Sequence, residues 1–80
     1  MEWSDISGAV ANAAPALGSA LAGPAGGAVG GLIASALGSK ESPDAVNAAL
    51  ESNPEAAAKL QALEQEHQRE IRSMTLEAET

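Results

Sequence analysis

The chain has 80 residues, a net charge of −7 and no cysteine, and 45% of its residues are hydrophobic, more than half of them alanine. An acidic chain lacks the basic surface that binds nucleic acid phosphates, and without cysteine it forms neither disulfides nor thiolate metal sites. Eighty residues with so few large apolar side chains give a marginal core. We therefore expect a small domain that forms a homo-oligomer or belongs to a larger assembly.

The first predicted element is a helix over residues 4–14. Ser4 is a suitable N-cap, and Asp5 then stands at the positive end of the helix dipole. Pro15 disfavours helical backbone geometry at Ala14. The sequence therefore predicts a kink or a break at this point.

Residues 17–38, LGSALAGPAGGAVGGLIASALG, are uncharged, and their small residues recur every four positions. That step places them on one face of a helix. Each interior glycine costs a helix about 1 kcal/mol, so this face needs a closely packed neighbour, as small-xxx-small helices have. A low-complexity linker is the alternative. The predicted helix-packing interface consists of Gly18, Ala22, Gly23, Gly26, Gly27, Gly30, Gly31 and Ala34.

Gly23 and Pro24 divide this region into two predicted helices, over residues 15–23 and 24–37. Pro24 suits the first turn of the second helix, and Gly38 suits a left-handed stop at its end. The Gly23-Pro24 pair is then either the turn of a helical hairpin or a kink in one long rod. The sequence alone leaves both open.

The uncharged run continues over residues 6–39, which is 34 residues and long enough to cross a bilayer. Its hydrophobicity is low, and proline and glycine weaken insertion further. We therefore favour helices buried in an assembly over an autonomous transmembrane helix. Trp3, the only aromatic residue, is expected either to plug the core or to anchor the chain at a membrane interface.

The composition changes at residues 39–42, a polar linker between a Gly/Ala-rich apolar region at residues 1–38 and an acidic helical region at residues 43–80. Ser42 and the proline and acid that follow it predict the start of a short helix over residues 43–52.

Asn53 stops that helix, and Pro54 opens a long helix over residues 54–78. Its apolar residues follow the 3.6-residue period of one amphipathic stripe. The amphipathic stripe consists of Leu60, Leu63, His67, Ile71 and Met74.

The remaining candidate residues match no metal-binding, phosphate-binding or catalytic arrangement. His67, with Glu64 and Glu70 three residues to either side, is better explained as a helix-surface histidine than as a metal ligand. The Gly-rich segment matches neither phosphate-binding motif, and the serines lack a nucleophile-base arrangement. We expect no enzyme activity, no cofactor, no metal and no small-molecule substrate.

In order and spacing, four segments resemble a known family: W-S-D-I at residues 3–6, the Gly/Ala segment of residues 14–38, and the proline-capped S-P-D-A-V and N-P-E-A-A-A-K-L. They look like the N-terminal region of the phage holin family with three transmembrane segments, the gene transfer agent holin type. The resemblance implies a phage-encoded, oligomeric protein that acts at the host inner membrane in host lysis.

In that family the strongly hydrophobic spans follow a charged helix like the one with which this sequence ends. We therefore weigh two roles, both without catalysis and both all-α. The first is a holin-like protein that oligomerises through the small-residue helix face and acts at the host inner membrane. The alternative is a structural or ejection-associated virion component that packs through the same helix face against phage structural proteins.

Overall fold

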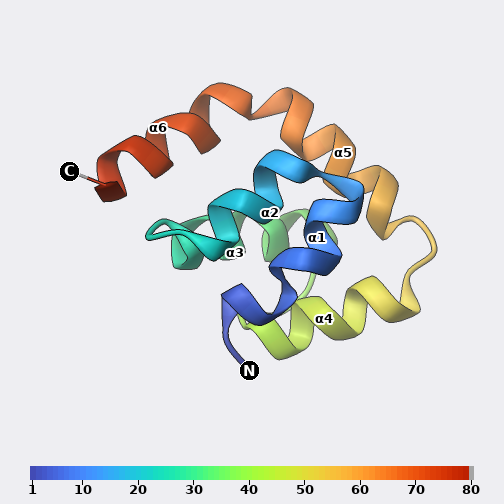
Figure 1. The fold of residues 1–80 in the computed structure, drawn as a ribbon. Coiled ribbons are helices and arrows are strands. Elements are labelled where there is room, and N and C mark those ends of the chain that lie inside the picture. The colour runs from blue at the N-terminus through green and yellow to red at the C-terminus, as the bar shows by residue number, and fades with distance from the viewer. Residues whose placement is uncertain (80) are drawn as a thin grey trace.

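The computed structural model describes residues 1–79, and these form a 3₁₀ helix followed by six α-helices (Figure 1). The all-α class predicted from the sequence is confirmed, and no strand occurs in the described part of the chain. The elements are η1 (Trp3–Ile6), α1 (Ser7–Ala13), α2 (Pro15–Ala22), α3 (Gly26–Leu37), α4 (Pro43–Ser52), α5 (Ala56–Glu66) and α6 (Gln68–Glu79).

The first helical segment begins earlier than predicted and changes type along its length. Glu2 rather than Ser4 occupies the N-cap, and its backbone N–H donates to the Asp5 carboxylate at 2.7 Å. Proposing Ser4 as the cap was wrong, because Asp5 reaches back to Glu2 from the third position of the helix. The break before Pro15 is confirmed, since Ala14 has an extended backbone.

The Gly23-Pro24 pair is the turn of a helical hairpin. The N–H of Gly26 donates to the Gly23 carbonyl at 3.1 Å, and the chain reverses direction between α2 and α3 (Figure 1). Pro24 lies in this turn, so placing it in the first turn of a helix was wrong by two residues. At the other end of α3, Gly38 adopts the predicted left-handed conformation with φ of 70°.

The short acidic helix has the predicted bounds. α4 begins at Pro43, and the Ser42 side chain accepts a hydrogen bond from the Ala45 N–H at 3.2 Å. Asn53 ends α4, and its side chain accepts from the Glu55 N–H at 2.9 Å. Both caps are local, which is why the sequence predicts them well.

The single long helix predicted over residues 54–78 is wrong, because the chain bends at His67 and forms α5 and α6. His67 has φ of −120° and ψ of 24°, outside the helical range. The bend still keeps backbone pairing: the His67 N–H donates to Leu63 and the Ile71 N–H donates to His67, each at 2.9 Å. A change of backbone conformation at this one residue therefore redirects the whole of α6.

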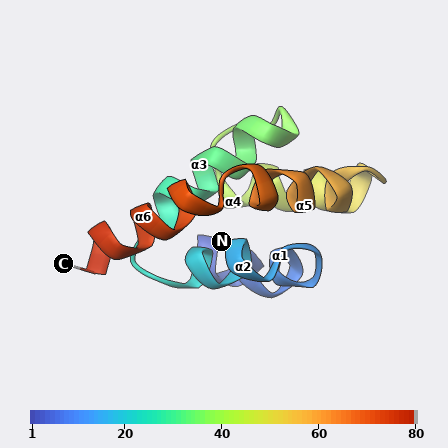
Figure 2. The same ribbon diagram turned by 90° about the horizontal axis from the view of Figure 1, so that it is seen from above.

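Seen from above, α5 and α6 lie across the molecule between the α1–α2 side and α3 (Figure 2). α5 contacts α1, α2 and α3, while α6 contacts α2 and α3. The largest fully buried side chains come from five of the six α-helices and form one core. They are Val10, Leu17, Leu21, Val29, Ile33, Val46 and Leu60.

Candidate functional site

Half of the predicted helix-packing interface faces the interior of the chain. A Cβ added to Gly18 would overlap Ala11, and one added to Gly26 would stand 2.6 Å from the Leu21 carbonyl oxygen. A Cβ on Gly30 would overlap the Trp3 ring, so Trp3 lies directly on this glycine and is half-buried there. At these glycines, other parts of the same chain therefore pack closely against the helix backbone. Ala34 is buried with them.

The other small residues of this interface lie toward the surface. Ala22, Gly23 and Gly27 are exposed, and a Cβ added to Gly27 meets nothing within 4 Å. Gly31 is half-buried, because the Glu41 carboxylate of the linker lies over it. The hairpin turn and the start of α3 thus present a surface almost without side chains of their own, with the exposed Glu2 beside it.

The amphipathic stripe of α5 and α6 is mostly buried despite the bend. Leu60, Leu63 and Ile71 belong to the core. Met74 is partly buried against it, and His67 at the bend is partly exposed. The periodicity identified the residues that face inward, although it did not predict the change of direction between them.

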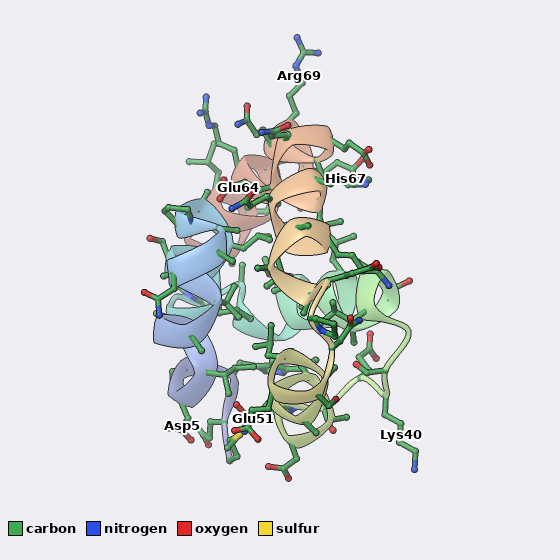
Figure 3. The ribbon with its side chains drawn as sticks, turned by 90° about the vertical axis from the view of Figure 1, so that its right-hand side faces the viewer. Asp5, Lys40, Glu51, Glu64, His67 and Arg69 are labelled. Carbon is green, nitrogen blue, oxygen red and sulfur yellow. The ribbon has the colours of Figure 1, made fainter. Side chains whose placement is uncertain are left out.

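His67 and Glu64 point to opposite sides of α5 (Figure 3). His67 Nδ1 lies 3.2 Å from Glu70 Oε2, but it makes no hydrogen bond of acceptable geometry, and its side chain is 32% exposed. Among the side chains described for residues 1–78, no group of three or more His, Cys, Asp or Glu is arranged to hold a metal ion. The carboxylate–histidine–carboxylate face considered from the sequence does not form.

Glu64 instead reaches the start of α2. Its Oε1 accepts hydrogen bonds from the backbone N–H groups of Ala16 at 2.6 Å and Leu17 at 3.3 Å. Sequence reasoning missed this role. The only available signal was the uncapped helix start after Ala14, and no local pattern shows which distant carboxylate supplies the cap.

A hollow of about 540 Å³ lies between the first four residues and the α2–α3 hairpin turn, and two further hollows lie between other helices. One, of about 410 Å³, is a groove between α2 and α6. Its walls are small or apolar residues such as Ala20 and Ile71, and Arg72 and Leu76 lie along it. The other, of about 390 Å³, lies between α1, α4 and α5, with alanines around Leu50 and with Glu51 at its edge.

Comparisons with protein families, with curated proteins and with solved structures find no match to this chain. None of the helices described for residues 1–79 combines the length and the hydropathy needed to span a membrane.

Proposed function

We propose that this chain is a non-enzymatic, phage-encoded helical protein that functions by packing against other proteins, as a structural or ejection-associated component of the virion. The observation that carries the proposal is the division of the small-residue interface. Gly26 and Gly30 pack closely inside the chain, whereas Gly23 and Gly27 stay exposed on a surface almost without side chains. Such a surface admits a second backbone at close range.

This role needs no cofactor, nucleic acid or small-molecule substrate. The interior glycines cost the helix about 1 kcal/mol each, and close contacts with Trp3 and Leu21 offset that cost within the chain. A Cβ on Gly27 meets no described atom within 4 Å, so this glycine has no such contact within the described chain. A partner backbone seated on Gly27 would supply it.

A holin-like protein that oligomerises and acts at the host inner membrane is the second candidate. The uncharged run of residues 6–39 favours it, as does the resemblance in the order of the sequence motifs. In this role the Gly/Ala helices would leave Trp3 and pack against other copies through Gly26 and Gly30. The two roles thus use different members of the predicted helix-packing interface.

Mass spectrometry of purified phage particles and of host inner-membrane fractions separates the two roles. A virion component appears in particles at a fixed copy number, whereas a holin-like protein appears in the membrane fraction and is absent from particles. Absence from both fractions contradicts both proposals.

A matched pair of substitutions tests the exposed surface itself. Gly27→Leu places a large side chain on the proposed contact, and Gly8→Leu places the same side chain on α1, where a Cβ also meets open space. We expect Gly27→Leu to lower incorporation into particles and Gly8→Leu to leave it unchanged. Equal incorporation of the two variants would exclude the surface around Gly27 as a contact.

A further inference from the structure

We propose that copies of this chain associate head to tail, with Leu76 of one copy seated in the hollow between α1, α4 and α5 of the next. The inference rests on the proposed function as an assembly protein and names the contact through which the chain meets another copy. Three features of the described surface support it: an exposed apolar side chain, a hollow that suits it, and charges of opposite sign beside the two.

The feature that would insert is Leu76, which lines the α2–α6 groove and is 58% exposed. Met1 is the other large hydrophobic residue that is strongly exposed in the described chain. Arg69 and Arg72 precede Leu76 by two turns and one turn, so they lie along the same side of α6. Both are exposed, and the whole chain has only four Lys and Arg residues. An apolar side chain is therefore flanked by half of the basic residues of an acidic protein.

The receiving feature is the hollow of about 390 Å³ between α1, α4 and α5. Ala13, Ala56 and Ala57 line part of it together with the half-buried Leu50, and the polar side chains of Asn12, Asn47 and Gln61 line the rest. Alanine walls leave room for a branched aliphatic side chain, whose burial there contributes favourable free energy. Glu51 at the edge is exposed, so the charge beside this hollow is negative.

The charges of Arg72 and Glu51 favour a second copy that is placed head to tail. Arg72 beside Leu76 faces Glu51 beside the hollow, which is the complementary arrangement. A two-fold contact between two α2–α6 grooves would instead bring the Arg72 side chains of both copies together, because Arg72 lines that groove. Repulsion between like charges disfavours the two-fold arrangement.

The two features cannot meet within one chain. α6 and the end of α4 lie far apart in Figure 1, and Arg69 and Glu51 lie at opposite ends of the view in Figure 3. A contact between different surfaces of identical chains is heterologous, so it continues from copy to copy and gives a ring or an open filament. In an open filament, Leu76 stays exposed at one end and the hollow between α1, α4 and α5 stays unfilled at the other. In a ring, every Leu76 and every hollow is paired.

Sedimentation velocity of the full chain over a range of concentrations tests the inference. The wild-type chain is expected to increase in mass with concentration. Leu76→Glu removes the apolar side chain that inserts and keeps the hollow. Ala57→Trp fills the hollow and keeps Leu76. Each variant alone is expected to stay monomeric, and an equal mixture of the two is expected to form a one-to-one complex. Ala62→Glu, the control at an exposed position of α5 that lines neither hollow, is expected to associate as the wild type does.

Charge reversal gives a second readout that does not depend on the size of a side chain. Arg72→Glu and Glu51→Arg should each weaken association about fivefold, and the double variant should recover it. A wild-type chain that is monomeric at every concentration overturns the inference. A mixture of the Leu76→Glu and Ala57→Trp variants that forms no complex overturns it as well. Presence in particles at a fixed copy number together with a monomeric chain in solution would leave the proposed function standing and exclude this contact.

Discussion

Glu64 and Ala16 join segments 48 residues apart, because the Glu64 carboxylate accepts the Ala16 N–H at 2.6 Å. The first N–H groups of a helix have no partner inside it, and Ala14, at the N-cap of α2, has no side-chain acceptor. Glu64 supplies that acceptor from α5, and its negative charge suits the positive end of the α2 dipole. The start of α2 therefore depends on where α5 docks.

We expect Glu64→Ala to lower the free energy of unfolding by about 1–2 kcal/mol, the usual effect of losing a helix cap. Glu64→Gln should cost roughly half as much, since the amide oxygen still accepts a hydrogen bond but carries no charge. Urea denaturation followed by circular dichroism measures both changes.

Glu66→Ala is the matched control for this prediction, because Glu66 is an exposed glutamate on the same helix. Its loss should change the unfolding free energy by no more than about 0.5 kcal/mol. Equal urea midpoints for the Glu64→Ala and Glu66→Ala variants would show that the cap does not stabilise the fold.

Two neighbouring glycines of α3 are expected to respond to alanine with opposite signs. Gly30→Ala would place a methyl group in the Trp3 ring, and overpacking of this kind costs about 1–3 kcal/mol. Gly27→Ala meets open space and should stabilise the chain by up to about 1 kcal/mol through helix propensity. Thermal unfolding measures the two signs, and Trp3 fluorescence should shift only in the Gly30 variant. Stabilisation by Gly30→Ala would mean that Trp3 does not lie on this glycine.

Most helix ends of this chain could be predicted from the sequence, because caps and prolines act on the backbone next to them. Pro15 marks the start of α2, Ser42 that of α4, and Gly38 the end of α3. The bend at His67 could not be predicted in this way. The sequence Glu66-His67-Gln68 contains neither proline nor glycine, and the bend accompanies the docking of α6 against α2 and α3.

The spacing of the small residues in the candidate packing surface could be predicted from the sequence. Which of these residues are exposed could not. Steps of four residues correctly grouped the small side chains of the Gly/Ala segment. Which of them remain exposed is decided by Trp3 and Glu41, which cover Gly30 and Gly31 from positions outside that segment. Contacts of this kind are set by the tertiary fold, so one sequence without its fold does not show them.

Gly38→Ala should destabilise the chain, because Gly38 has φ of 70° and closes α3 by donating its N–H to Ser35. An L-residue with a Cβ pays roughly 1–2 kcal/mol in this conformation. Gly38→Asn should cost less, since asparagine tolerates left-handed geometry. Gly8→Ala is the control on α1, where a Cβ meets open space and no positive φ is required. Melting temperatures rank the three variants, and a Gly38→Ala variant as stable as Gly8→Ala would contradict this prediction.

Ile71→Ala should release α6 while leaving the rest of the fold intact. Ile71 is 4% exposed, and the other described side chains of α6 are half-buried or exposed, so its truncation removes the main anchor of this helix. Truncating a buried isoleucine costs about 2–5 kcal/mol, and the weak contacts left to α6 do not offset that loss. Native-state hydrogen exchange is expected to show lost protection of the α6 amides with α1 to α5 still protected. Ser73→Ala, at an exposed position of the same helix, should preserve protection throughout. Uniform loss of protection in the Ile71→Ala variant would instead mean that α6 unfolds only together with the core.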